Sequence, residues 1–232
     1  MEIVGVPRNP APNQNYLING NFDVWQRGTT ITDNLDRSNV YFLADMWSYS
    51  TSLGGATMPA MIQSQQQVLP GDLPNSYYFY RLNVDGPGTG WASGTRHWVS
   101  NRVEGLVARA ESIGRDVTVT LYARSSIPGK LLGLFLMQNF GSGGSGAAYV
   151  NGTTFNLTSA WQKFWWTFTV PDITGATVTA DNALQVHIVT AWGSTWLPKL
   201  NTGTIETFVG AGNIDFTQVK LERGDMATPL VP

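Results

Sequence analysis

The sequence predicts an all-β fold: an antiparallel two-sheet β-sandwich of the jelly-roll type with an extended N-terminal arm. Apolar and polar residues alternate over several short segments, which is the period of a half-buried strand. The 25 glycines and 12 prolines separate these segments with turns. Only 13% of the residues are charged, which is too few to cover the exposed faces of a helical protein.

The first predicted element follows a tight turn at Asn19 and Gly20, two residue types that tolerate positive φ. We expect a strand after it, with Phe22 and Val24 on one side and Trp25 on the other. Weaker strand patterns follow at residues 44–49, 61–67, 77–84, 97–103 and 205–209. No segment predicts a helix of ordinary length, and the best candidate, residues 102–113, is interrupted by a glycine.

The second half of the chain carries the clearest strand patterns, at residues 116–124, 131–137, 161–170, 184–188 and 214–222. Residues 131–137 are almost entirely apolar, which predicts a strand covered on both faces. The apolar phase shifts between Phe216 and Val219, which predicts a β-bulge. His187 alternates with apolar neighbours, so we expect it to face solvent or an interface. The small residues of 140–148 predict a long loop.

Two parts are expected, an extended arm over residues 1–15 and one sandwich domain over residues 16–232. The arm is rich in proline, which fixes φ and removes a backbone donor. Two interpretations stay open: a frayed terminus, or an arm that docks on a neighbouring subunit. The docking residues would be Val6, Pro7, Arg8, Pro10 and Pro12.

Composition excludes several function classes. The net charge is −2 and no basic run occurs, which argues against nucleic-acid binding. The sequence contains no stretch of 18 apolar residues, so no membrane span is expected. The absence of cysteine excludes disulfides and thiolate metal sites. The first residues lack the apolar segment of a signal peptide, so we expect synthesis in the cytoplasm and exit by another route, such as cell lysis.

Six pieces of the sequence, spread over nearly the whole chain, follow a known order of motifs: residues 17–29 (LINGNFDVWQRGT), 44–47 (ADMW), 117–125, 138–145, 157–170 and 219–229. In these pieces the chain resembles a group of phage and prophage virion proteins. Members of that group look like carbohydrate-binding-module jelly rolls and occur in tail fibres, tail-associated proteins and head decoration proteins. The resemblance therefore implies a virion surface role with glycan affinity. The chain departs from the pattern at Met46, where the group has arginine, and in a longer Gly/Ser loop at residues 140–148.

The candidate contact residues are tryptophans in loop-like, polar stretches. Four of the nine tryptophans lie there: Trp91, Trp98, Trp192 and Trp196. Three interpretations stay open: rings folded onto the edge of the core, a subunit contact, or a platform for a sugar. Trp47, Trp161 and Trp166 lie on strand patterns and are expected in the core.

Catalysis and metal binding find little support. The two histidines, His97 and His187, lie far apart in the sequence, and no Gly-x-Ser-x-Gly turn is present. Carboxylates that a glycosidase could pair are Asp23, Asp45, Glu104, Asp215 and Glu222, which we expect on the surface instead. By analogy with carbohydrate-binding jelly rolls, a structural calcium is conceivable at Asn19, Asn21, Asp23 and Asp215. No other cofactor is expected.

The sequence thus leads to a non-enzymatic virion protein, in the first place a head decoration or cement protein. The alternatives are a tail-fibre-type module that recognises a host glycan, and a glycosidase or depolymerase. Expected partners are capsid or tail proteins, further copies of the chain, and a host glycan. A homotrimer is the first expectation, by analogy with proteins on threefold axes.

Overall fold

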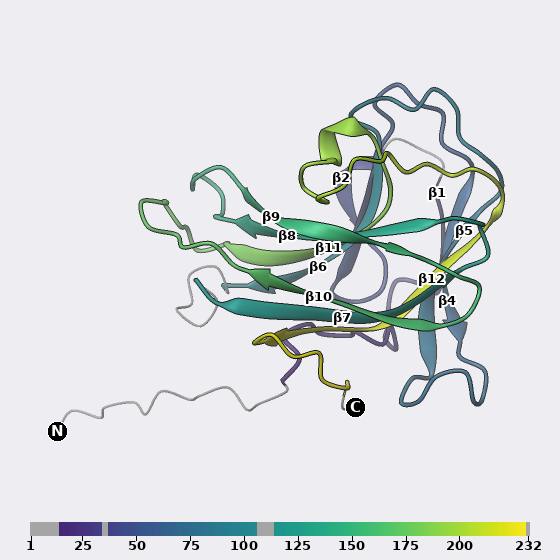
Figure 1. Ribbon diagram of the computed structural model, residues 1–232, viewed down its shortest axis with the longest axis horizontal. Helices are drawn as coiled ribbons and strands as arrows, with labels where there is room; N and C mark the ends of the chain where they lie inside the picture. Colours follow the sequence, from purple (N-terminus) through teal and green to yellow (C-terminus); the bar gives the residue numbers. More distant parts are fainter. Residues whose placement is uncertain (1–13, 34–36, 106–113, 231–232) are drawn as a thin grey trace.

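The computed structural model describes residues 14–33, 37–105 and 114–230. These residues form two six-stranded sheets that stack face to face (Figure 1). All strand pairings are antiparallel. The predicted all-β sandwich of jelly-roll type is confirmed. In the described part of the chain, no helix is long and apolar enough to cross a membrane.

Each sheet is named here after a central strand. The β12 sheet has the spatial order β1 (Thr30–Asp33), β4 (Met61–Gln67), β5 (Tyr78–Val84), β12 (Gly212–Arg223), β7 (Asp116–Ser125) and β10 (Gln162–Thr169). The β11 sheet has the order β2 (Arg37–Phe42), β3 (Trp47–Ser52), β6 (Arg96–Glu104), β11 (Ala183–Trp192), β8 (Leu131–Asn139) and β9 (Ala148–Asn156). A single 3-10 turn, η1 (Ser194–Trp196), follows β11.

The core lies between the sheets and is lined by the apolar positions of the alternating strands. In β7, Val117, Val119 and Leu121 point inward and are buried. At one end the core holds an aromatic group, in which the Phe22 ring lies 4.7 Å from Trp47 and 5.5 Å from Phe216. The N-terminal segment therefore contributes to the main core.

The predicted bulge in the last strand is confirmed. The register of β12 against β7 shifts between Thr217 and Lys220, and Gln218 takes a left-handed φ of 52°. The chain before β1 pairs with the strand beyond the bulge, because the Val219 amide donates to the Gly20 carbonyl at 2.9 Å. A Cβ at Gly20 would lie 2.1 Å from the Val219 oxygen, so this approach requires glycine.

The strand predicted at residues 22–26 is wrong, because a side chain takes over the role of a pairing strand. The Asn19 amide donates to the Val24 carbonyl at 2.9 Å, and the Val24 N–H donates to Asn19 Oδ1 at 3.1 Å. Phe22 has a φ of 59°. This turn buries Phe22 and Trp25 together and leaves Val24 exposed, which is not the expected alternation.

Other expectations also need correction. Residues 205–209 form only an isolated bridge, Trp192 to Glu206, and β1, β2 and β9 were not predicted. The start of the helix candidate at 102–113 belongs to β6, and residues 106–113 lie outside the described part. Trp47 is buried as expected, but Trp166 is exposed, and Trp161 is half-buried on the outer face of the β12 sheet. Trp166 lies on the edge strand β10, whereas Trp161 packs on Phe79 and Arg124 of the outer face.

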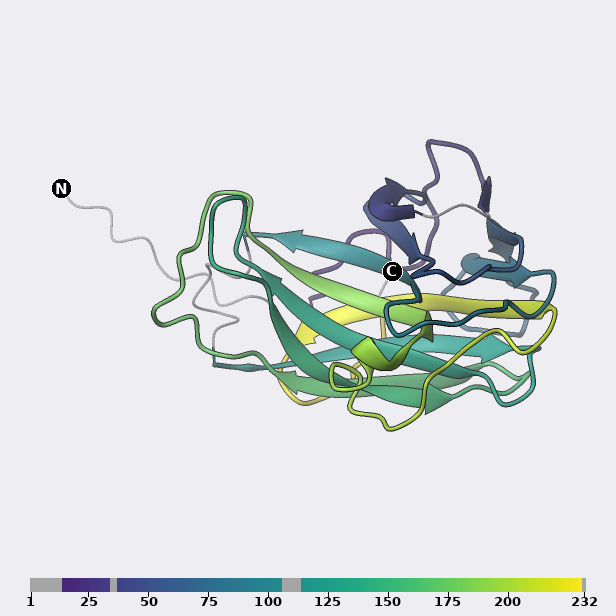
Figure 2. The ribbon, with the colours of Figure 1, turned by 90° about the horizontal axis from the view of Figure 1, so that it is seen from above.

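The predicted loop at 140–148 is present and is tied to the 171–182 loop. The Ser142 amide donates to Asp181 Oδ1 at 2.8 Å, and the Ser145 amide donates to the Thr177 carbonyl at 2.9 Å. Figure 2 shows the two loops together at one end of the sandwich.

Candidate functional site

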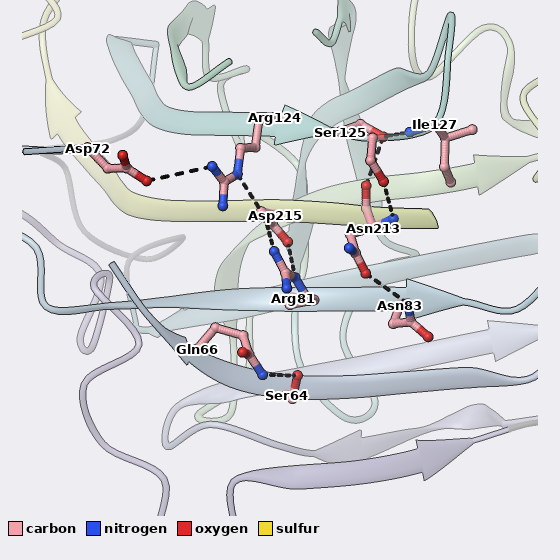
Figure 3. A network of polar contacts seen from close by, with 11 residues as sticks. Ser64, Gln66, Asp72, Arg81, Asn83, Arg124, Ser125, Ile127, Asn213 and Asp215 are labelled. Atoms are coloured by element: carbon pink, nitrogen blue, oxygen red, sulfur yellow. Dashed lines mark hydrogen bonds and ion pairs between the residues drawn. The ribbon is translucent and has the colours of Figure 1, made fainter. Parts of the chain in front are cut away.

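The outer face of the β12 sheet is a polar network whose charges satisfy one another (Figure 3). Asp215 accepts two hydrogen bonds from Arg81, both at 2.7 Å, and one from Arg124 at 2.9 Å. Arg124 also lies 3.7 Å from Asp72. Bidentate pairs of this kind fix the arginines in place and leave few groups available for a ligand.

The calcium residues suggested by the sequence do not fit a calcium ion. Asp215 is enclosed by two guanidinium groups, and the Asn19 side-chain oxygen already accepts the Val24 amide. Calcium needs about six to eight oxygen ligands. Burial raises the pKa of Asp23, and a hydrogen bond to the Asn21 side chain partly offsets this. No cluster of three metal-ligating side chains occurs in the described ranges.

The outer face of the β11 sheet is different, because two small polar side chains, Ser48 and Ser100, lie on it; they are called the serine floor here. Ser48 on β3 lies opposite Ser100 on β6, with 3.1 Å between the two hydroxyl oxygens. Ser100 in turn lies opposite His187 on β11, and His187 lies opposite Phe135 on β8. Across the sheet, the serine floor on β3 and β6 is therefore followed by aromatic side chains on β11 and β8.

These aromatic side chains belong to a larger group, called the aromatic cluster here. It consists of Trp98, Phe135, Tyr149, His187 and Trp196, from β6, β8, β9, β11 and η1. His187 stacks on Phe135 with 4.6 Å between ring centroids and 9° between planes. Trp196 meets Trp98 edge to face at 4.8 Å. Such contacts add to the stability gained by burying the rings.

The turn that carries Trp196 is held firmly above the sheet. The Gly193 amide donates to the Thr95 carbonyl at 2.8 Å, and the Gly152 amide donates to the Lys199 carbonyl at 2.8 Å. Leu200 packs on β8 at Gly133, where a Cβ would lie 2.8 Å from a Leu200 methyl carbon. The cluster is therefore pre-formed rather than assembled by a mobile loop.

Two cations lie against the rings of this cluster. The Arg96 guanidinium carbon is 4.5 Å from the Trp98 ring centroid and 5.2 Å from that of Trp196. Lys199 Nζ is 3.9 Å from the Tyr149 centroid and 4.0 Å from the Trp196 centroid. Both distances are typical of cation–π contacts.

Burial and these cations shift the titration of two groups on the face. The pKa of His187 falls to about 3, mainly because burial opposes its charged form and further because of Arg96 and Arg102. The pKa of Lys199 is lowered by burial and then by Arg96. His187 is only 2% exposed, so the expectation that it faces solvent is wrong: the aromatic cluster covers it.

A hollow of about 510 Å³ lies on the same face beside the serine floor. Four exposed apolar side chains gather there: Ile18, Val24, Phe42 and Met46. Its polar lining comes from Asn19, Gln26, Arg27, Asp45, Ser48, Arg102 and Glu104. Ser48 belongs to both the hollow and the floor, and it is two strands, or about 10 Å, from His187.

Several buried polar atoms on this face have no hydrogen-bond partner in the described structure. They are Trp196 Nε1, His187 Nδ1 and, at the hollow, Asp45 Oδ2. Of these three residues, only Asp45 lines the hollow.

The structure brings two of the four predicted contact tryptophans together, Trp98 and Trp196. Trp192 is fully buried beneath the turn that follows β11, with its indole N–H donated to the Thr204 carbonyl. Trp91 packs on Phe208 at 5.8 Å, against the main core. The arm residues Val6, Pro7, Arg8, Pro10 and Pro12 lie outside the described residues.

The sequence reasoning missed four residues of the site: Arg96, Phe135, Tyr149 and Lys199. Phe135 lies in the continuous apolar run of β8, where it alternates with core residues on the other side of the strand. A period-two count over residues 131–137 would have placed it on the outer face. The other three carry no signal without the pairing of the strands.

The carboxylates considered for catalysis are mostly engaged. Asp215 and Glu222 are each only 2% exposed, so the expectation that they lie on the surface is wrong. Asp215 is paired with two arginines, and Glu222 with Lys220 at 3.0 Å. Asp45 and Glu104 both line the hollow. The second histidine, His97, is buried and hydrogen-bonded to Thr190 at 2.7 Å.

Comparisons with known proteins give similarity in fold only. No family model matches the sequence, and no curated protein matches it. A CBM4 structure is 17% identical, with 90% of this chain and 99% of that chain covered and a TM-score of 0.48. A putative sugar binding protein from Bacteroides thetaiotaomicron is 11% identical, with 91% and 100% covered and a TM-score of 0.48.

A third similar structure is the enzymatically active domain of tailspike protein 4 from bacteriophage CBA120. It is 12% identical, with 90% of this chain but only 21% of that chain covered, and a TM-score of 0.43. Identities at this level do not transfer a ligand or a role to this chain.

Proposed function

We propose that this chain is a non-catalytic carbohydrate-binding β-sandwich whose ligand lies across the outer face of the β11 sheet. The observation that carries the proposal is the aromatic cluster next to a hollow on one face. Sugars are bound by flat aromatic faces against C–H groups and by a few polar groups that hold the hydroxyls. The exposed side chains of Gln26, Arg27 and Glu104, which line the hollow, supply polar groups of this kind.

The dimensions of the face favour an extended oligosaccharide. From Phe42 on β2 to Tyr149 on β9 the face crosses six strands, a span of about 24 Å. Between these ends, the small side chains of Ser48 and Ser100 project little above the sheet and leave room for a ligand. A chain-like ligand can therefore contact the hollow and the aromatic cluster at once.

The test is binding of soluble polysaccharides measured by calorimetry, with Tyr149→Ala as the main variant. Tyr149 is 37% exposed, so its removal should leave the fold intact. We expect about a tenfold loss of affinity, or about 1.4 kcal/mol. Trp165→Ala is the matched control, since Trp165 is exposed on β10 of the other sheet. Equal losses in both variants would contradict the proposed face.

The competing catalytic function rests on Asp45 and Glu104, which line the same hollow. A glycosidase with this pair would release reducing ends from a bound polysaccharide, and Glu104→Gln would abolish that release. Our proposal expects no release from any polysaccharide that the chain binds.

We further propose that the module is displayed on a phage particle, as a head decoration protein or, alternatively, as part of a tail fibre. The support is that two of the motifs that resemble phage proteins, residues 17–29 and 44–47, are hydrogen-bonded to each other. Trp47 Nε1 donates to the Asn19 carbonyl at 2.9 Å, and Asn19 Nδ2 donates to the Asp45 carbonyl at 2.9 Å. Motif residues with such defined roles are less easily matched by chance than surface residues.

In this proposal the arm attaches the module to capsid or tail proteins, and copies assemble, with a trimer expected first. Deletion of residues 1–13 should abolish attachment to particles and leave the sandwich folded. The deletion must stop before Asn15, whose Oδ1 accepts the Leu221 amide at 2.9 Å. Light scattering gives the assembly state. Normal attachment of the truncated chain would contradict the role of the arm.

A further inference from the structure

We infer that the saccharide bound on the β11 sheet is anionic, with a carboxylate, sulfate or phosphate group held by Lys199 and Arg96 beside Trp196. This inference rests on the proposed function and specifies its ligand class.

Most cations that the described structure buries or half-buries on the β12 sheet have a carboxylate partner. Arg81 and Arg124 have Asp215, and Lys220 has Glu222, whereas the half-buried Lys163 donates to the Ala227 carbonyl at 3.2 Å. The interior lysine, Lys130, has Glu206 at 2.8 Å.

Lys199 differs from these paired cations. It is half-buried, and its Nζ contacts two aromatic rings, with no carboxylate in ion-pair distance among the described residues. A half-buried ammonium gives up part of its hydration, and rings replace only part of it. An anion at this position would complete the set of partners.

The donors around Trp196 match an acceptor-only group. The guanidinium of Arg96 and the ammonium of Lys199 both lie against this one indole. Both groups donate hydrogen bonds and neither accepts. Ionised carboxylates, sulfates and phosphates accept only, and charge-assisted hydrogen bonds to them are the strong ones.

The electrostatics of the face point the same way. The pKa of Lys199 is lowered by Arg96, and that of His187 by Arg96 and Arg102, after burial in each case. No carboxylate contributes to either shift. The chain as a whole carries a net charge of −2, so this positive region is local and does not reflect composition.

The alternative is a purely structural role, in which Lys199 covers the rings with its aliphatic stem and binds no anion. The two interpretations differ in what Lys199 does to ligand choice. A covering lysine stabilises the fold and leaves the discrimination between acidic and neutral saccharides unchanged.

The experiment uses matched pairs of polymers that differ only in charge: polygalacturonate and its methyl ester, dextran sulfate and dextran, and phosphorylated and unphosphorylated mannan. Affinity is measured at low and physiological salt, since the charge-dependent part weakens with ionic strength. We expect one acidic polymer to bind at least about tenfold more tightly than its neutral partner.

Lys199→Met should remove most of that discrimination, and Lys199→Arg should restore part of it. The control is Lys163→Met, which removes one positive charge from β10 on the other sheet. Circular dichroism confirms that each variant is folded.

The outcomes separate the two proposals. Equal binding of acidic and neutral partners would overturn the anionic ligand and leave the carbohydrate-binding function standing. Unchanged discrimination in Lys199→Met would overturn the site. Binding to no saccharide in any pair, or elsewhere in a wide neutral panel, would remove the proposed function and this inference with it.

Discussion

Acid should destabilise this protein well above the range in which carboxylates titrate, because both of its histidines are buried. His97 is 0% exposed and His187 is 2% exposed. Burial lowers the pKa of each to about 3, helped by Lys130 for His97 and by Arg96 and Arg102 for His187. The perturbation is a change of pH from 7 to 5.

The size follows from proton linkage. Between pH 6.5 and about 3 the unfolded chain binds a proton at each histidine and the folded chain does not, so the free energy of unfolding falls as the pH falls. At pH 5 the loss is about 1.5 pH units times 1.36 kcal/mol, or about 2 kcal/mol for each histidine. The two together give about 4 kcal/mol, a large part of the 5–15 kcal/mol typical of folded domains.

The assay is urea unfolding followed by tryptophan fluorescence at half-unit steps of pH. His187→Gln and His97→Gln should each remove about half of the change between pH 7 and pH 5, whatever they do to stability at pH 7. The double variant should show almost none. A wild-type change of less than about 1 kcal/mol, or a full change in the double variant, would refute the reasoning.

Three further outcomes are expected in thermal unfolding. Glu206→Gln leaves the buried Lys130 charge unpaired and should cost about 3 kcal/mol, a fall in Tm of about 6–12 °C, which Lys130→Met should largely reverse in the double variant. Asp215→Asn loses two arginine partners and should cost about 2 kcal/mol without changing saccharide affinity, since it lies on the opposite face. Gly152→Ala places a Cβ 1.6 Å from a carbonyl oxygen of β8 and should cost at least about 2 kcal/mol, whereas Gly146→Ala, with nothing within 4 Å, should change little.

The sequence predicted the elements whose stability comes from a buried face. The strands β7, β8, β10 and β11 follow from alternation or from a continuous apolar run, and the bulge in β12 follows from a phase shift. These signals are local, because each strand shows its inner side in its own residues.

The N-terminal turn and the candidate site were harder to predict, because they depend on contacts between distant segments. Asn19 replaces strand pairing by hydrogen bonds from its side chain, which no periodicity reveals. Trp98 and Trp196 stood out as tryptophans, but their contact requires the register of β6 on β11 and the turn that follows β11. Tyr149 lies on β9, a strand whose glycine and asparagine content concealed it.

The position of β12 also constrains how the chain reaches its native state. It is the last strand in the described part of the chain, yet it lies between β5 and β7 and also pairs with the segment around Gly20. Until β12 is inserted, β5 and β7 each have an unpaired edge. The β12 sheet then consists of two separate halves, β1-β4-β5 and β7-β10. A ribosome-bound chain that ends before residue 212 should therefore remain incompletely folded, and the rate of folding should be set by closure of these long loops.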